Sequence, residues 1–205
     1  MAVILVRHGE TALNAARIMQ PAATPLSERG REQAFALGRR LAAQGRIAAV
    51  LSSDLPRAWL TAEAVAAALA LPIEPNPLLQ ERNFGELRGR PYDTLGFDPL
   101  VMQQAPPGGE SAAAFAQRAL DAFDLMLQRH AGLDGDLVVV THGLLIRTLL
   151  AGPLQLEGER LRELHLANTS LSIFDAAPPH ALQLLNCTRH LDPSAREPAR
   201  GLSGG

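Results

Sequence analysis

The feature that most constrains the fold is a set of three short segments without a single polar residue. They are residues 3–6, 48–51 and 137–140, and the first and last are rich in valine. A strand with one face in water alternates apolar and polar residues, whereas a strand covered on both faces stays apolar throughout. The three segments therefore predict strands of a parallel sheet that is buried on both sides.

Segments of helical length separate the predicted strands. Residues 28–44 carry apolar residues at helical spacing, with Ser27 placed to cap the start of a helix and Gly45 to end it. Residues 56–69 and 111–130 show the same pattern. This alternation predicts an α/β fold, a three-layer sandwich whose mostly parallel central sheet is flanked by helices.

Two regions depart from the alternation. Residues 82–110 are rich in glycine and proline and lack periodicity, which predicts an irregular lid or insertion. Residues 171–175 and 182–185 flank two prolines and predict two strands joined by a turn at the edge of the sheet. We expect a single domain over residues 1–191 and a flexible tail over residues 192–205.

Each apolar segment ends in polar residues that could carry chemistry. The first is followed by Arg7 and His8, the second by two serines and then Arg57, and the third by Thr141 and His142. In open α/β sheets, ligands bind beyond the carboxyl ends of the strands. If the strands are parallel, two histidines and two arginines converge there, and the sequence predicts an anion site that contains a nucleophile.

These residue types fit phosphoryl transfer. Arginine guanidinium groups match phosphate oxygens and stay charged at any working pH. A neutral imidazole can attack phosphorus and form a phosphohistidine that water then hydrolyses. Gly9 and Gly143 would let backbone amides approach the same oxygens closely. Glu81 is one of several carboxylates that could protonate the leaving oxygen.

Each residue also has a plainer interpretation when taken alone. A histidine after an apolar segment is more often structural than catalytic, Arg57 could simply be solvated, and exposed glutamates such as Glu81 are common. Solvation and structural roles do not explain why two histidines and two arginines gather at strand ends. The alternative metal-binding interpretation is a zinc site of His8, His142 and His190.

Composition narrows the classes of partner. With 19 basic and 21 acidic residues, the formal net charge of -2 gives no overall attraction to nucleic acid or to an anionic membrane. All the basic residues are arginines, which excludes a P-loop lysine or a Schiff-base lysine. The lone cysteine, Cys187, and the lack of a signal-peptide pattern favour a cytoplasmic protein. We expect a small phosphorylated metabolite as partner, with no nucleic acid and no membrane, and a homodimer stays open.

Several motifs follow one another along the chain. They are VRHGET at 6–11, TPLSERGREQA at 24–34, LSSDLPRAWLTAE at 51–63, LQERNFGELRG at 79–89, PPGGES at 106–111, VVVTHGLLIR at 138–147, NTSLSIF at 168–174 and LLNCTRHL at 184–191. This ordered set resembles the histidine phosphatase superfamily, in the branch that contains cofactor-dependent phosphoglycerate mutase. The resemblance covers nearly the whole of the expected domain.

The resemblance implies a role for each residue at the strand ends. It implies that His8 is the phosphorylated nucleophile, that Glu81 is the proton donor and that no metal takes part. We expect no cofactor. It also implies that the irregular segment covers the pocket. The further residues implied in binding phosphate and substrate are Arg7, Asn14, Arg57, His142, Gly143 and Leu144. Leu144 stands where the family commonly has a glycine, and the acidic residue that usually precedes "PL" is absent from "QPAATPL".

Three functions fit these observations. The first is a metal-independent phosphomonoesterase that hydrolyses small phosphorylated metabolites through a phosphohistidine. The second is a phosphoglycerate mutase and the third a catalytically silent phosphate-binding module, which the complete set of core residues weakens. Phe84 stands where the mutases resemble one another in having a tyrosine, and their long insertion is missing, so the chain resembles the shorter phosphatases. Four lid residues could contact a second substrate group, although solvated charges are the plainer interpretation: Arg82, Arg88, Arg90 and Tyr92.

Overall fold

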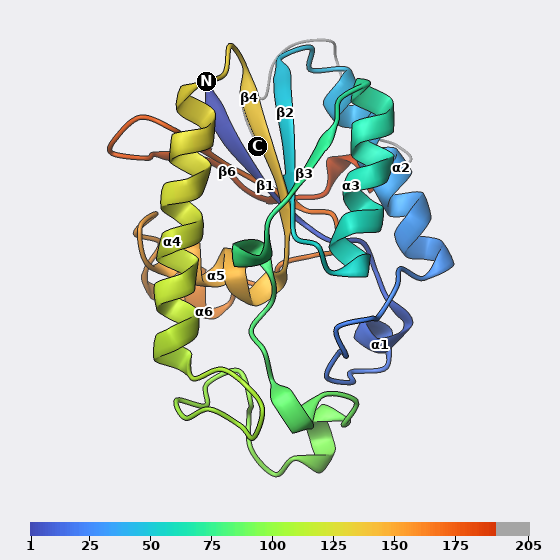
Figure 1. Cartoon of the computed structure of the whole chain (residues 1–205), viewed down its shortest axis with the longest axis vertical. Coiled ribbons are helices and arrows are strands. Elements are labelled where there is room, and N and C mark those ends of the chain that lie inside the picture. The colour runs from blue at the N-terminus through green and yellow to red at the C-terminus, as the bar shows by residue number, and fades with distance from the viewer. Residues whose placement is uncertain (192–205) are drawn as a thin grey trace.

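A six-stranded sheet forms the centre of the computed structural model, which describes residues 1–191 (Figure 1). The strand order is β3-β2-β4-β1-β5-β6, with β1 to β4 parallel and β5 and β6 antiparallel. The predicted mostly parallel α/β sheet is thereby confirmed, and the predicted tail over 192–205 lies outside the described residues. The strands are β1 (Ala2–Arg7), β2 (Ile47–Ser52), β3 (Ile73–Pro75), β4 (Asp136–Thr141), β5 (Leu171–Asp175) and β6 (Leu182–Cys187).

Helices cover both faces of the sheet, as the apolar segments predict. In β1, Ile4 and Val6 pack toward α2 (Glu28–Ala42) and α3 (Pro56–Leu69). The alternate residues Val3 and Leu5 pack toward α4 (Ala112–Ala131) and α5 (Gly143–Ala151). Figure 1 shows α4 on one side of the sheet and α2 with α3 on the other. Because successive side chains of a strand point to opposite faces, a strand between two helical layers has no polar positions.

The predicted helix starts and ends hold with small shifts. Ser27 caps α2 by accepting a hydrogen bond from the amide of Gly30, and Gly45 follows the helix with a φ of +67°. Ser111 lies just outside α4 and caps it through the amide of Ala114. The helix over 56–69 has the predicted bounds, because Pro56 occupies the first helical position.

The predicted hairpin lies at the edge of the sheet. Strand β5 pairs with β1, and β6 pairs with β5 and forms the edge, ending two residues later than predicted. After the predicted strand at 137–140, mostly apolar residues continue to position 151, where the structure has β4, His142 and then helix α5. Apolar periodicity alone does not separate a buried strand from a buried helix.

Short elements escaped prediction because they carry too few residues for a periodic pattern. They are α1 (Ala12–Ala15), α6 (Gly158–Arg162), β3 and the single-turn 3₁₀ helices η1 (Pro77–Leu79), η2 (Gly85–Leu87), η3 (Tyr92–Thr94) and η4 (Arg189–Leu191). No helix within residues 1–191 is long and apolar enough to cross a membrane.

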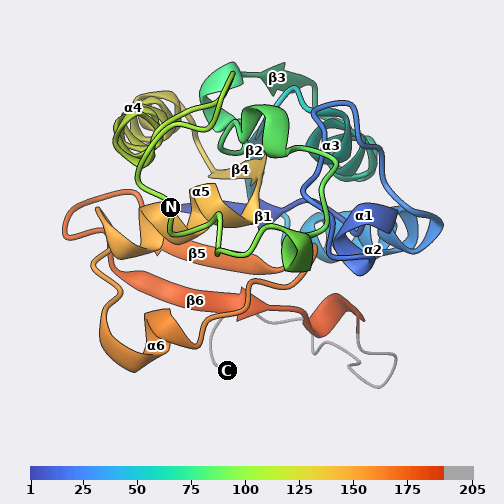
Figure 2. The same cartoon turned by 90° about the horizontal axis from the view of Figure 1, so that it is seen from below.

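The irregular segment predicted over 82–110 contains only η2 and η3. It lies beyond the carboxyl ends of the parallel strands, at the bottom of Figure 1, and Figure 2 views the molecule from that end. Its buried residues Phe84, Leu87 and Leu95 pack with Met19 in a small apolar cluster of their own. The segment therefore has its own small core, next to the carboxyl ends of the strands where the polar residues gather.

Candidate active site

Strand pairing places the two histidines side by side. Arg7 and Thr141 are register partners at the ends of β1 and β4, and the amide of His8 donates to the carbonyl of Thr141 at 2.9 Å. The next residues, His8 and His142, have ring centroids 5.2 Å apart. The predicted convergence of the histidines at one edge of the sheet is thus confirmed.

The imidazole of His8 is buried and held in one tautomer. Its Nδ1 lies 2.7 Å from the carbonyl oxygen of Gly9, and because a carbonyl only accepts, Nδ1 carries the proton. Burial lowers the pKa of His8 well below its usual value, and the charges of Arg57 and Arg7 lower it further. His8 is therefore neutral at neutral pH, with the lone pair on Nε2.

His142 is also buried and neutral. Burial lowers its pKa well below the usual value, and Arg57 and His8 add to the shift. Its Nε2 lies 2.9 Å from the hydroxyl oxygen of Ser53, which also accepts from the amide of Leu55. Nδ1 of His142 is buried without a partner among the described residues, and it carries an N–H in the tautomer in which Ser53 donates to Nε2.

Two guanidinium groups, one buried and one half-buried, complete a cluster of positive charge. Arg57, in the first turn of α3, is buried, and burial lowers its pKa to about 10 despite the opposing charge of Glu81. Burial also lowers the pKa of Arg7, which donates through Nη1 to the carbonyl of Leu166. The Nε atoms of Arg7 and Arg57, like Nδ1 of His142, are buried donors without a partner in the described chain. Buried donors and buried cations are costly without acceptors, so the cluster is suited to an anion.

Glu81 lies against the same cluster. Its Oε2 accepts from the amide of Leu144 at 3.1 Å and its Oε1 from the amide of Arg82 at 3.0 Å. Its charge is the largest influence that raises the pKa of both Arg7 and Arg57 against the effect of burial. The carboxylate that was hardest to justify from sequence is therefore an electrostatic neighbour of both predicted arginines.

Asn14 and Gly143 also lie at the cluster. Asn14 accepts from the side-chain amide of Asn168 at 3.4 Å, and the same amide of Asn168 donates to the carbonyl of His8 at 3.0 Å. Gly143 begins α5 beside Arg7, where a Cβ atom would lie 3.4 Å from the Arg7 Nε. A cavity of about 700 Å³ opens from Arg7 and Asn14 beneath residues 92–100 of the irregular segment. All eight predicted site residues therefore lie at or next to one end of the sheet.

The predicted role of Gly9 is wrong. Its amide donates to the hydroxyl oxygen of Thr61 at 2.9 Å, so it is not available to a phosphate oxygen. A Cβ atom at Gly9 would lie 2.5 Å from the carbonyl oxygen of Gly30. The glycine is required because the loop after β1 packs directly on the first turn of α2.

The four undecided lid residues occupy different environments. For Arg82 the solvated interpretation is wrong: its side chain is buried and donates to the carbonyls of Glu110, Met102 and Gln104. Tyr92 is half-buried and lines the cavity with Arg7, and the charge of Arg88 lowers the pKa of Arg57. Arg90 is exposed.

The three-histidine zinc site is not formed. His190 lies instead with Thr169 and Arg40, at 3.0 Å from the Thr169 hydroxyl and 3.4 Å from Arg40 Nη1. Within residues 1–191 no group of three or more histidine, cysteine, aspartate or glutamate side chains could hold a metal ion.

Sequence reasoning missed the residues that orient the cluster. Ser53 was visible after the second strand but carried no signal of a bond to His142. Thr61 and Asn168 lie 52 and 160 residues from the atoms of the VRHGET motif that they contact, so no local pattern could have found them.

Comparisons with known proteins agree with this geometry. The model of a family described as "Histidine phosphatase superfamily (branch 1)" matches residues 3–188. A "Probable phosphoglycerate mutase GpmB" from Yersinia pestis is 35% identical over 93% of this chain and 94% of its own length. A phosphoserine phosphatase from Entamoeba histolytica has a TM-score of 0.77 at 26% identity, covering 93% of this chain and 98% of its own. The mycobacterial glucosyl-3-phosphoglycerate phosphatase Rv2419c has a TM-score of 0.75 at 26% identity, covering 93% of this chain and 99% of its own.

Proposed function

The chain belongs to branch 1 of the histidine phosphatase superfamily, and within it we propose that the protein is a metal-independent phosphomonoesterase acting on small phosphorylated metabolites. The observation that carries the proposal is His8, a neutral imidazole whose Nδ1 proton is bound by Gly9 and whose Nε2 lone pair is free. It lies among buried cations and unpartnered donors. A nucleophile of that kind in an anion site fits attack on phosphorus.

In the proposed first step, Arg7, Arg57 and the N–H of His142 hold the phosphoryl oxygens. Nε2 of His8 attacks phosphorus as the bond from phosphorus to the ester oxygen breaks. The charge that moves onto the phosphoryl oxygens meets donors that need no rearrangement. The carbonyl of Gly9 stabilises the positive charge that develops on the ring, since it accepts from Nδ1 throughout.

Glu81 handles the proton in both steps of the proposed reaction. Its carboxyl group gives a proton to the departing ester oxygen, which leaves as an alcohol. A water molecule then attacks phosphorus, the bond between phosphorus and Nε2 breaks, and the Glu81 carboxylate takes a proton from that water. Inorganic phosphate leaves, and His8 and Glu81 return to their starting states.

A phosphoglycerate mutase is the second candidate, because the relatives from Yersinia carry that name. A mutase must exclude water from the phosphohistidine and hold both ends of a bisphosphorylated intermediate. Here the cavity beyond Arg7 and Asn14 is lined by Asp93 and Asp98 as well as Arg17. The two carboxylates balance the guanidinium groups of Arg7 and Arg17 in the same lining, so that space has no surplus of positive charge for a second phosphate, which supports hydrolysis over transfer.

The lid supports the same choice. Phe84, which stands where the mutases have a tyrosine, is buried in the apolar cluster of the lid beneath the Arg82 guanidinium at 5.2 Å. It offers no hydroxyl to a substrate. A catalytically silent module is disfavoured because the nucleophile, the phosphate-binding cluster and the carboxylate occur together.

A paired assay tests the proposal. Phosphate release from a panel of small phosphomonoesters is measured beside isomerisation of 3-phosphoglycerate, coupled to enolase and supplied with 2,3-bisphosphoglycerate. We expect phosphate release that survives EDTA and only weak isomerisation. Isomerisation faster than hydrolysis by about tenfold, or roughly 1.4 kcal/mol in barrier height, would favour the mutase instead. Loss of activity with EDTA that zinc restores would overturn the metal-independent mechanism.

A further inference from the structure

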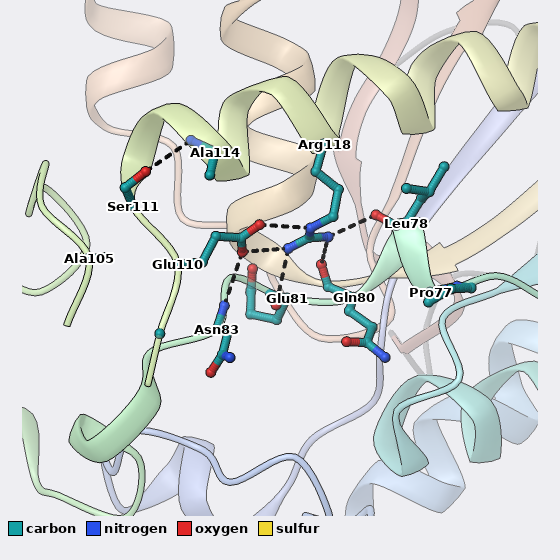
Figure 3. Close-up of a pocket in the computed structure, with 11 residues that line it drawn as sticks. Pro77, Leu78, Gln80, Glu81, Asn83, Ala105, Glu110, Ser111, Ala114 and Arg118 are labelled. Atoms are coloured by element: carbon teal, nitrogen blue, oxygen red, sulfur yellow. Dashed lines mark hydrogen bonds and ion pairs between the residues drawn. The ribbon is translucent and has the colours of Figure 1, made fainter. Parts of the chain in front are cut away.

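The backbone that carries Glu81 is held by an arginine from a distant helix. Arg118, in α4, donates through Nη1 to the carbonyl of Leu78 at 2.9 Å and to that of Gln80 at 2.7 Å. Its Nη2 reaches the carbonyl of Glu81 at 3.5 Å. Figure 3 shows the Arg118 side chain extending from the helix to these carbonyls, beside a cavity of about 650 Å³. One side chain thus binds three carbonyls at and before the proposed proton donor.

Glu110 completes this arrangement from the other side of Glu81. Its carboxylate binds Arg118 through two bonds, at 2.9 Å from Nε and 2.8 Å from Nη2. Its Oε2 also accepts from the amide of Asn83 at 3.2 Å. The pair therefore binds backbone groups on both sides of Glu81 (Figure 3). Bidentate pairing fixes geometry as well as charge.

The pair of Arg118 and Glu110 is partly shielded from solvent, and all the nitrogens of the guanidinium group donate hydrogen bonds. The side chains of Arg118 and Glu110 are 19% and 17% exposed. Phe115, one turn earlier in α4, lies under the guanidinium of Arg118 at 5.0 Å. Nε, Nη1 and Nη2 of Arg118 all donate hydrogen bonds within this chain. The arginine therefore binds protein atoms and is not available to a free anion.

The segment around Glu81 needs such support. After η1 ends at Leu79, residues 80–84 belong to no helix or strand. The Glu81 carboxylate itself is held by two amides, those of Arg82 and Leu144. If the carbonyls behind it move, the carboxylate moves relative to His8, which is fixed by the sheet.

A second arginine and glutamate pair on the same helix provides a comparison. Arg129, also in α4, binds Glu74 of β3 through two bonds, at 2.8 Å and 2.5 Å. Its side chain and that of Glu74 are 34% and 40% exposed. This pair joins α4 to the far edge of the sheet and contacts no residue next to Glu81. If the Arg118 pair affects the position of Glu81 and the Arg129 pair does not, the effect cannot be attributed to bidentate pairs of α4 in general.

We propose that Arg118 and Glu110 are positioning residues that hold the Glu81 carboxyl at the leaving oxygen of the substrate. The inference rests on the proposed function, in which Glu81 is the proton donor. A displacement of about 1 Å between reacting groups can cost about a hundredfold in rate. Loss of the pair should therefore affect the esters that need protonation of the leaving group, and spare those that do not.

The test compares two esters: the leaving group of glycerol phosphate would be a strongly basic alkoxide unless it is protonated, whereas that of p-nitrophenyl phosphate is a stable phenolate. Arg118→Met should lower kcat/KM on glycerol phosphate by about tenfold to a hundredfold, through kcat with little change in KM, and should change kcat/KM on p-nitrophenyl phosphate by less than about threefold. Glu110→Gln should show the same selectivity with a smaller loss, because the amide oxygen still accepts from Asn83. Arg129→Met is the matched control and should leave both rates unchanged.

Combining each variant with Glu81→Gln separates a positioning role from a structural one. If Arg118 acts through Glu81, Arg118→Met should have no further effect on glycerol phosphate once Glu81 is replaced. Equal losses on both esters, or losses that multiply with those of Glu81→Gln, would overturn the inference. If Arg118→Met fails to fold, Arg118→Lys, which keeps the charge and loses the second bond to Glu110, is judged by the same two criteria. A wild-type protein that releases no phosphate from either ester would instead overturn the proposed function.

Discussion

The carboxyl ends of the parallel strands and the irregular segment next to them are built in opposite ways. At the sheet, Arg7 and His8 follow a buried strand, and pairing with β4 sets their distance from His142. In the irregular segment, the only helices or strands within residues 82–110 are single-turn helices, and the large apolar side chains of Phe97, Leu100 and Val101 are exposed. We call these strand ends the rigid end, because strand pairing holds their backbone. In the proposed reaction the phosphoryl group binds there, and the irregular segment faces the part that differs between substrates. This difference suggests that the reaction is fixed by the sheet and the choice of substrate by the segment.

The largest expected effect belongs to the rigid end. His8→Ala should lower turnover by at least about ten-thousandfold on every ester, because the proposed reaction passes through a bond between phosphorus and the His8 ring. The fold should persist, which denaturant unfolding of the variant would check. Turnover above about one per cent of the wild type would contradict the comparison, because the strand end would then not fix the reaction.

The next effect tests the boundary between the two regions, where Glu81 lies. Glu81→Gln should lower kcat/KM, which reports formation of the phosphohistidine, by about a hundredfold for alkyl phosphates and by less than about tenfold for p-nitrophenyl phosphate, since nitrophenolate leaves without a proton. Steady-state rates on the two esters measure the ratio. Equal losses would assign the proton to another residue.

Acid should destabilise the rigid end through its histidines. Since the folded pKa values of His8 and His142 lie well below the usual value of about 6.5, neither residue affects stability above that pH. As the pH falls below it, the unfolded chain binds protons that the folded chain does not. The free energy of unfolding then decreases by about 1.4 kcal/mol per pH unit for each histidine.

Replacing His142 by glutamine should remove one of these contributions. Between pH 6 and pH 5, urea unfolding of the variant should depend on pH less steeply than the wild type, by about 1.4 kcal/mol per unit. Parallel curves for the two proteins would show that His142 titrates normally in the fold.

The smallest effect belongs to the irregular segment. Phe97 lines the cavity beside Arg7 and is 49% exposed. Phe97→Ala should lower kcat/KM for 1-naphthyl phosphate by about threefold to tenfold through lost apolar contact, and leave inhibition by inorganic phosphate unchanged. Val101→Ala is the matched control, because Val101 is 67% exposed on the same segment but does not line that cavity. A change in phosphate inhibition in the Phe97 variant would show that the irregular segment influences phosphate binding at the strand ends, which would contradict the comparison.

The two regions also differ in what their sequence predicts. His8, His142 and Arg57 could be found from the residues alone, because buried parallel strands are visible as apolar segments and their ends meet at one edge. Glu81 follows no apolar segment, and only the resemblance to a family gave it a specific role. Arg118 could not be found at all, since it contacts Gln80 from 38 residues away. Contacts between an irregular segment and a distant helix leave no periodic trace.

The central claim is that His8 is the nucleophile and attacks through Nε2. p-Nitrophenyl phosphate with a labelled phosphoryl group is mixed with the Glu81→Gln variant, which needs no proton donor to form the intermediate from this ester but should slow its hydrolysis. The reaction is quenched in alkali, where phosphohistidine survives. Because Gly9 holds the proton on Nδ1, the account predicts an acid-labile phosphate on Nε2 of His8, absent when His8 is also replaced by alanine. Label on Nδ1 of His8, or an acid-stable phosphate on any other side chain, would contradict it.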